Sequence, residues 1–215
     1  QMSDGYNVAI MGATGAVGQI FLELLAERDF PMDELRLLAS SRSAGKELTC
    51  GERMVKVQEL TGDSFDGIDI VLSSAGGDIS REFVPAAVGT GAVIVDNTSA
   101  FRMDPDVPLV VPEVNPGDLD GHSGIIANPN CSTIQMVAAL KPLHDLQPIK
   151  RVVVSTYQSV SGGGKEAMDE LFNQTRGIYA NEPFHKYQSK FPKQIAFNVI
   201  PHIDVFMEDG STKEE

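Results

Sequence analysis

The stretch Gly12-Ala13-Thr14-Gly15-Ala16-Val17-Gly18 decides the expected fold of this chain. It follows a short apolar run at residues 7–11 and precedes residues 16–28, whose apolar side chains recur at helical spacing. Glycines spaced as G-x-x-G-x-x-G allow a tight turn in which backbone N–H groups approach a pyrophosphate at the start of a helix. Because the motif stands between a strand and a helix, it predicts a dinucleotide-binding loop.

Beyond this loop, segments with strand-like and helix-like patterns alternate. A second apolar strand is expected at residues 35–39, and residues 79–88 have the spacing of a helix. Several strand-like runs are apolar on both faces, which is typical of a parallel sheet covered by helices on both sides. The sequence therefore predicts an α/β fold with a Rossmann-like, doubly wound parallel sheet. Further strands are expected at residues 68–72 and 92–95, and an antiparallel hairpin at residues 46–57.

Composition and charge narrow the classes of function. With 215 residues, of which 42% are hydrophobic, the chain can build one large domain, or one complete domain and part of a second. The net charge of -13 disfavours nucleic acid and anionic membranes as partners, and no apolar run is long enough to cross a bilayer. The two cysteines make no disulfide framework, the four histidines lack metal-ligand spacing, and the first residues lack a secretory signal. A cytoplasmic protein without a metal centre is expected.

The end of the second predicted strand indicates which dinucleotide is bound. NAD sites usually carry an acidic residue there, which binds the ribose hydroxyls. This chain has Ser40-Ser41-Arg42-Ser43 instead, and Arg42 can pair with a 2′-phosphate. NADP is therefore expected rather than NAD, with a surface arginine that binds no ligand as the alternative.

The regular alternation stops between residues 101 and 130, which are rich in proline, aspartate and glycine. We place a boundary there and assign residues 1–127 to an NADP-binding Rossmann-like domain. Residues 128–215 are assigned to the start of a second, α+β domain that is incomplete. In this second part, helices are expected at residues 132–143 and 165–176, and strands at residues 151–160 and 194–200.

Cys131 is the candidate nucleophile. It stands in Asn128-Pro129-Asn130-Cys131-Ser132-Thr133, directly before an apolar helical segment. Unsatisfied N–H groups and the dipole at a helix start favour a thiolate, which is a strong nucleophile toward aldehydes and acyl phosphates. The alternative is a buried structural cysteine, which is the interpretation that fits Cys50.

Six motifs occur in a fixed order: Gly12–Gly18, Ser40–Lys46 (SSRSAGK), Asp96–Arg102 (DNTSAFR), Pro112–Asn115 (PEVN), Asn128–Thr133 (NPNCST) and Gln158–Gly162 (QSVSG). Over essentially the whole chain, this pattern resembles bacterial aspartate-β-semialdehyde dehydrogenase. N-acetyl-glutamyl-phosphate reductases share the architecture, but in them an aromatic residue and a proline typically follow the cysteine. Ser132 and Thr133 at those positions argue against that family.

By position, the resemblance implies a role for each matching residue. Cys131 corresponds to the nucleophile and Gln158 to the glutamine that contacts the substrate near the thiol. Arg102 corresponds to the arginine that binds substrate or inorganic phosphate, assisted by Asn130. The implied cofactor contacts are Gly12, Thr14, Gly15, Ala16, Val17, Arg42 and Ser43 with NADP, and Ser161 and Gly162 near the nicotinamide.

Simpler interpretations stay open for some of these residues. Arg102 could be solvated or pair with Asp104. Gln158 could be an ordinary polar residue at the end of a strand, and residues 162–164 could be a flexible loop.

The resemblance also implies a reaction. The Cys131 thiolate attacks L-aspartyl-4-phosphate and expels phosphate, while Arg102 stabilises the leaving group. NADPH reduces the thioester, and collapse of the thiohemiacetal releases L-aspartate-4-semialdehyde. Such an oxidoreductase serves the biosynthesis of lysine (through diaminopimelate), methionine, threonine and isoleucine, and it acts as a homodimer or homotetramer whose second domain is catalytic and forms the interface.

The chain departs from the family in one respect. The family's general-base histidine and the arginine for the substrate carboxylate lie further downstream, and no histidine here stands in the family's histidine motif. We therefore expect an N-terminal fragment with negligible turnover by itself. Two other functions stay open: a related acyl-phosphate reductase, and a non-catalytic NADP-binding relative, against which Cys131 argues.

Overall fold

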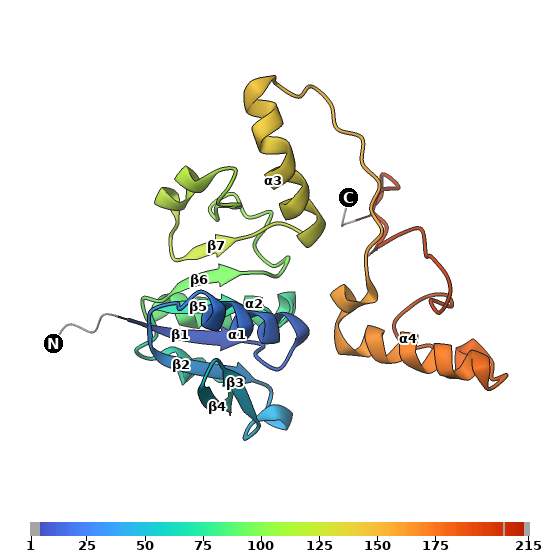
Figure 1. Ribbon diagram of the computed structural model, residues 1–215, viewed down its shortest axis with the longest axis horizontal. Coiled ribbons are helices and arrows are strands. Elements are labelled where there is room, and N and C mark those ends of the chain that lie inside the picture. The colour runs from blue at the N-terminus through green and yellow to red at the C-terminus, as the bar shows by residue number, and fades with distance from the viewer. Residues whose placement is uncertain (1–4, 204, 213–215) are drawn as a thin grey trace. The chain divides into compact units, whose positions relative to one another are not determined.

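The computed structural model describes residues 5–203 and 205–212 and divides into two compact units. The first unit ends at Thr156 and the second begins at Tyr157. Within the described residues, the first unit contains a seven-stranded sheet and the second is built around one long helix, α4 (Figure 1).

The sheet runs in the spatial order β3-β4-β2-β1-β5-β6-β7. Neighbouring strands are parallel, except for the antiparallel hairpin of β3 and β4. From β1 the chain builds outward through β2 on one side and through β5 on the other, which is the doubly wound pattern. The strands are β1 Tyr6–Met11, β2 Met32–Ala39, β3 Glu47–Cys50, β4 Arg53–Glu59, β5 Ile70–Ser73, β6 Val93–Asp96 and β7 Ile125–Ala127.

Helices α1 (Ala16–Glu27) and α2 (Gly77–Gly89) cover opposite faces of this sheet. Successive side chains of a strand point to opposite faces, and β1 is buried on both. Ile10 packs in one core cluster with Leu22 of α1, whereas Met11 packs in the other with Val84 of α2. Each fully buried aliphatic side chain contributes about 1.5–3 kcal/mol, so β1 is the central support of the unit.

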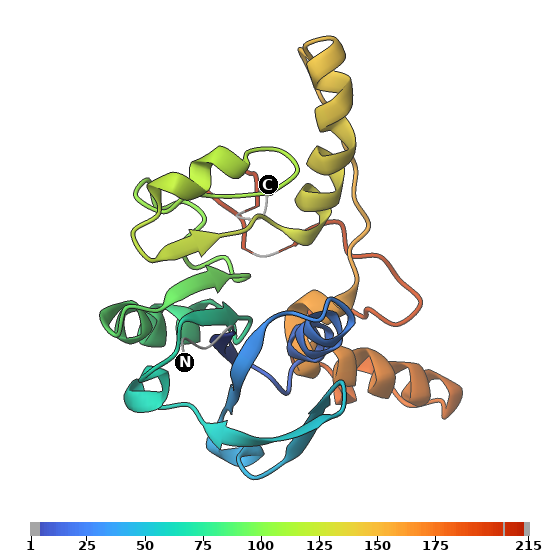
Figure 2. The ribbon, with the colours of Figure 1, turned by 60° about the vertical axis from the view of Figure 1, so that its left-hand side comes forward.

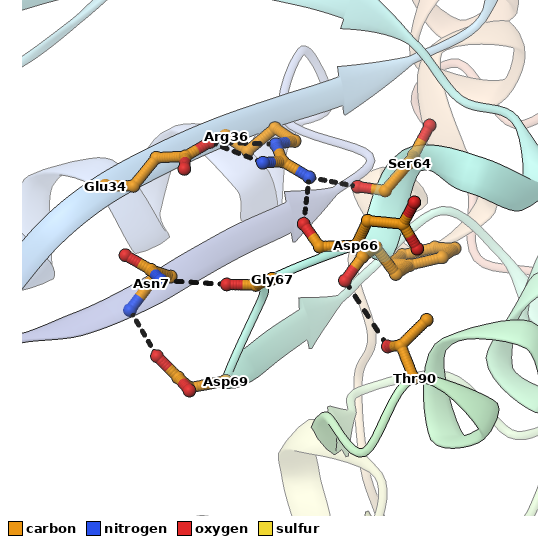
Figure 3. Close-up of polar contacts among 9 residues, drawn as sticks. Asn7, Glu34, Arg36, Ser64, Asp66, Gly67, Asp69 and Thr90 are labelled. Atoms are coloured by element: carbon orange, nitrogen blue, oxygen red, sulfur yellow. Dashed lines mark hydrogen bonds and ion pairs between the residues drawn. The ribbon is translucent and has the colours of Figure 1, made fainter.

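Polar contacts fasten the turn before β5, at the edge where the parallel strands begin (Figure 3). The Arg36 guanidinium donates to the Ser64 carbonyl at 2.8 Å. The Asn7 amide donates to the Gly67 carbonyl at 2.8 Å, and its backbone N–H donates to the Asp69 carboxylate at 2.7 Å. These contacts give the backbone of an irregular turn its hydrogen-bond partners, which is a structural role.

Helix α3 (Cys131–Leu146) follows β7 and differs from α1 and α2. In both views it extends away from the sheet beyond β7 (Figures 1 and 2). None of its residues is fully buried, and Leu143 and Leu146 are exposed. The position of α3 therefore depends mainly on its first residues, which follow β7 closely, because the helix has no fully buried apolar face.

Two strand predictions are wrong. Residues 151–159 have no regular structure, and residues 194–200 form a turn and irregular backbone. Val153 in the first segment is 80% exposed. A strand exists only through hydrogen bonds to a neighbouring strand, and the described residues supply none to either segment. Both segments therefore have a strand-like sequence, but within the described residues neither has a neighbouring strand to pair with.

The second unit is organised by the buried face of α4 (Gly164–Tyr179), which confirms the helix predicted there. The Glu170 carboxylate accepts backbone N–H groups from Ser189 (3.1 Å) and Phe191 (3.2 Å). Gln174 accepts the N–H groups of Ile195 (2.9 Å) and Ala196 (3.2 Å). Side chains of the helix thus take the place of strand pairing for residues 189–196.

The predicted fold class is confirmed. The structure contains every strand and helix predicted before residue 150, with bounds that differ by a few residues, and the antiparallel hairpin within residues 46–57. The domain boundary predicted after Ala127 falls at the end of β7 and stays a prediction.

The close packing of the glycine turn leads to a stability prediction. A Cβ on Gly18 would overlap the Gly12 carbonyl oxygen and lie 2.7 Å from the Ala13 Cα. Gly18→Ala is therefore expected to lower the free energy of unfolding by about 1–3 kcal/mol, measured by chemical denaturation. Gly89→Ala, where nothing lies within 4 Å of the added Cβ, is the matched control and should be neutral or slightly stabilising. Equal stability of the two variants would contradict this packing.

Candidate functional site

The parallel sheet brings the candidate residues of the first unit to one edge. Strands β1, β2, β5, β6 and β7 run in the same direction, so the loops after their carboxyl ends lie along the same edge. The glycine turn follows β1, Arg42 follows β2, Arg102 lies in the loop after β6, and Cys131 comes shortly after β7. Four segments that are distant in the sequence are thereby collected at one edge of the sheet.

The turn after β1 has the backbone geometry of an anion-binding loop. Gly12 has a φ of 90°, and a Cβ on it would lie 2.9 Å from the backbone of Ala75. The N-cap of α1 is Gly15, and no described side chain caps the helix. The first-turn N–H groups, including those of Ala16 and Val17, can therefore serve a phosphate.

The sequence motifs do not single out the loop after β5, residues 74–77, yet it lies against this turn. The Ser74 N–H donates to the Met11 carbonyl at 2.9 Å, and a Cβ on Gly12 would meet the backbone of Ser74. Gly76 has a φ of 99° and is the N-cap of α2. The signal that could have found the loop is a small-residue run directly after a strand that neighbours β1.

At the end of β2, Ser41–Ser43 form a 3₁₀ turn on which Arg42 is exposed and Ser43 is half-buried. Lys46, to which the sequence analysis assigned no role, places its Nζ 3.4 Å from the Ser43 hydroxyl. Residues 40–46 thus offer two cations and several hydroxyls, with no carboxylate among them. This set of groups suits a phosphate monoester.

Cys131 is the first residue of α3 and is exposed, as its proposed role requires. The N-cap is Asn130, whose side-chain oxygen accepts the Ser132 N–H at 2.9 Å and the Ser132 hydroxyl at 2.6 Å. The Cys131 Sγ lies 3.8 Å from the same oxygen. Asn130 therefore fixes the turn that presents the thiol.

Arg102 is held by the loops after β6 and β7. Its Nε donates to the Asn128 carbonyl at 2.9 Å and its Nη2 to the Asn97 carbonyl at 3.2 Å. The guanidinium is thus fixed against the segment that leads into Cys131. The Asn128 Oδ1 is buried without a hydrogen-bond partner among the described residues, so it can accept a bond from a bound group.

Three predicted site residues lie in the second unit. Gln158 is half-buried, whereas Ser161 and Gly162 are exposed on the 3₁₀ turn Val160–Gly163. The unit contains a hollow of about 720 Å³ that is open to solvent, and Gln158 forms part of its wall. The other lining residues are Ser159, Val160, Leu171, Ile195, Phe197, Asn198 and Val199.

Cys50 is buried in β3, as predicted, whereas Cys131 is exposed at the start of a helix. Its Sγ donates to the Leu22 carbonyl at 3.4 Å. Burial raises the pKa of the Cys50 thiol, and nearby Arg53 opposes the shift only in part.

Two further observations concern the described residues as a whole. No group of three or more His, Cys, Asp or Glu side chains among them is arranged to hold a metal ion. None of the helices among them combines the length and apolar character needed to cross a membrane.

The fold and the site define a Rossmann-like α/β protein in which a glycine turn and an exposed cysteine share one edge of the sheet. Residues 7–122 match the family model described as semialdehyde dehydrogenase, NAD binding domain, and residues 140–215 match the semialdehyde dehydrogenase, dimerisation domain. The chain belongs to the semialdehyde dehydrogenase family, and the resemblance to aspartate-semialdehyde dehydrogenase is confirmed.

Aspartate-semialdehyde dehydrogenase from Aquifex aeolicus is 60% identical over 98% of this chain and 63% of the relative. A crystal structure of aspartate semialdehyde dehydrogenase II complexed with ASA, from Vibrio cholerae, has a TM-score of 0.93 and 52% identity over 99% of this chain and 63% of its own. An aspartate semialdehyde dehydrogenase with NADP from Candida albicans has a TM-score of 0.57 and 33% identity over 68% of this chain and 48% of its own. This chain thus spans about 63% of the length of its first relatives.

The contrast between the two cysteines gives a chemical prediction. Iodoacetamide at neutral pH is expected to alkylate Cys131 at least about ten times faster than Cys50, since the thiolate is the reactive form and Cys50 is buried and protonated. Peptide mass spectrometry over time measures both rates in the same sample, so each cysteine serves as the control for the other. Equal rates in the folded chain would contradict the assignment of Cys131.

Proposed function

We propose that the complete protein carrying this sequence reduces L-aspartyl-4-phosphate to L-aspartate-4-semialdehyde with NADPH. The observation that carries the proposal is the exposed Cys131 at the start of α3, on the same sheet edge as the glycine turn. The membership of the semialdehyde dehydrogenase family supports the reaction class, and the relative complexed with ASA supports the substrate.

Cys131 acts as the nucleophile in this proposal. Its thiolate attacks the acyl carbon, the carbon–oxygen bond to phosphate breaks, and the acyl group remains on sulfur as a thioester. Arg102 binds the departing phosphate, which a guanidinium can do with two parallel hydrogen bonds. Asn130 presents the thiol through its cap of α3, and Gln158 contacts the substrate.

The residues present fit a dinucleotide. The close approach of the Gly12 and Gly18 backbones to their neighbours forms a turn that any Cβ would disrupt, and the first turn of α1 has no side-chain cap. Gly12 and Thr14–Val17 would hold the pyrophosphate, and Ser161 with Gly162 would contact the nicotinamide end. The bound dinucleotide supplies the hydride that reduces the thioester.

We assign NADP rather than NAD to this site. Arg42 and Ser43, supported by Lys46, offer positive charge and hydroxyls where an NAD site usually has a carboxylate. A protein with a net charge of -13 needs such local cations to hold an additional phosphate. The NADP-bound relative from Candida albicans agrees with this choice.

We also propose a homodimer or homotetramer. Residues 140–215 match a dimerisation domain, and the second unit exposes large apolar side chains, which include Phe172, Phe197 and Val199. Exposed apolar side chains of this size suit a surface that is covered by another part of the protein or by a partner. The division into an NADP-binding domain at residues 1–127 and a catalytic and dimerisation domain from residue 128 belongs to the same proposal.

The activity is tested by NADPH formation from L-aspartate-4-semialdehyde, NADP and phosphate. In the complete protein, Cys131→Ala is expected to reduce kcat by at least about a thousand-fold, because the proposed thioester cannot form without the Cys131 sulfur. Cys50→Ala removes the other thiol and should keep most of the activity. Wild-type protein without phosphate-dependent NADPH formation would reject the proposed function.

The choice of cofactor is tested by binding to the 215-residue chain. Arg42→Ala is expected to weaken NADP about ten-fold or more, with NAD changed less than about two-fold, because only NADP carries the phosphate that Arg42 pairs with. Calorimetry measures both affinities. Arg53→Ala is the matched control, since Arg53 begins β4 and donates to Met32 at the opposite edge of the sheet. Parallel losses of NADP and NAD in Arg42→Ala would contradict the assignment.

A further inference from the structure

A buried carboxylate lies beneath the loop that carries Arg102. Asp96, the last residue of β6, is 0% exposed, and it forms no ion pair within the described part of the chain. Its Oδ1 accepts the Thr98 N–H at 3.0 Å and the Ser80 hydroxyl at 3.1 Å, and its Oδ2 accepts the Thr98 hydroxyl at 2.9 Å. The Ser80 hydroxyl also lies 2.8 Å from that of Ser73. Polar neighbours thus replace the water that the carboxylate loses on burial.

The same network continues toward Arg102. The Thr98 hydroxyl accepts the Ala100 N–H at 3.1 Å, which fixes the turn between Asp96 and Arg102. At the other end of this turn, the guanidinium donates to the Asn97 carbonyl at 3.2 Å. The residue that follows Asp96 therefore supplies a carbonyl that orients Arg102.

The network also reaches the segment that leads into Cys131. The Asn128 amide donates to the Asn97 Oδ1 at 2.9 Å, and the Asn128 N–H donates to the Asp96 carbonyl at 3.2 Å. The Asn128 carbonyl also accepts a hydrogen bond from Arg102, through its Nε at 2.9 Å. The loops that follow β6 and β7 are thus locked to each other around the guanidinium.

We propose that Asp96 is a positioning residue for Arg102. Through Thr98 and Asn97, its carboxylate holds the guanidinium in the direction in which it receives the phosphate of the substrate. An apolar side chain would fill this buried position at lower cost in desolvation. Among the described residues the Asp96 carboxylate accepts three hydrogen bonds, and two of them come from Thr98 in the loop that carries Arg102. Its main effect is therefore on the geometry of that loop. The inference rests on the proposed role of Arg102 in phosphate binding.

Thr98 offers a substitution that breaks this connection with little change in shape. Thr98→Val removes the hydroxyl that links Asp96 to the Ala100 N–H, whereas Thr98→Ser keeps it. Thr90→Val is the matched control, because the Thr90 hydroxyl also makes hydrogen-bond contacts, but at the end of α2. It lies 2.8 Å from the Ala87 carbonyl oxygen and 3.3 Å from the Phe65 carbonyl oxygen, and Figure 3 shows one of these contacts. Asp96→Ala tests the carboxylate itself. If Asp96→Ala does not fold, the result for Thr98→Val decides the proposal.

The readout in the complete protein is NADPH formation with varied phosphate. Thr98→Val is expected to raise the KM for phosphate about five-fold, with the KM for NADP changed less than about two-fold. Thr98→Ser and Thr90→Val should both stay near the wild type. A merely structural role would shift both KM values together or neither, and either result would overturn the proposal.

Amide hydrogen exchange of residues 97–102 gives a second readout that needs no activity. Exchange in this segment should be faster in Thr98→Val than in wild type and Thr90→Val, because the turn loses its anchor. Unchanged exchange would overturn the proposal. If the wild type itself lacks phosphate-dependent activity, the proposed function is rejected, and exchange alone decides whether Asp96 and Thr98 hold the Arg102 loop.

Discussion

The parallel pairing of β1 with its neighbours is the constraint on which the rest of this structure depends. Hydrogen bonds to both β2 and β5 place β1 in the centre of the sheet, and burial on both faces leaves it no alternative register. Since parallel strands end at the same edge, this pairing and its continuation through β6 and β7 gather the glycine turn, Arg42, Arg102 and Cys131 there. The edge where the strands begin is fastened by contacts such as Arg36 to Ser64, which have no chemical role in the site.

Two buried carboxylates organise irregular backbone in the same way. Asp96 holds the loop after β6, and Glu170 holds residues 189–191 in the second unit. Both are nearly inaccessible to solvent, and both receive N–H and hydroxyl donors in place of water. A segment without strand or helix leaves its N–H groups unsatisfied, and a carboxylate can accept several of them at once. This explains how two buried carboxyl groups are accommodated in otherwise costly positions.

Local burial separates the chemistry of the two thiols. Cys50 lies in β3 within the core cluster that also contains Leu22, and its raised pKa keeps it protonated. Cys131 begins a helix that has no fully buried residue, so its sulfur is presented to solvent at the edge of the sheet. The same side chain is thus a core residue in one position and a candidate nucleophile in the other, and the tertiary contacts make the difference.

The sequence by itself determined the local elements. The glycine turn, the helix from Ala16, the hairpin within residues 46–57 and the helix at Cys131 follow from periodicity, glycine spacing and capping, which act within a few residues. The motifs also identified the family. Only the tertiary structure decided which residues meet, because pairing partners are chosen over long sequence distances. The runs at residues 151–160 and 194–200 have strand-like patterns, yet they form no strand where the described chain provides no neighbour. The loop at residues 74–77 and the link between Asn97 and Asn128 have their places in the site only through contacts between residues far apart in the sequence, which a linear pattern does not encode.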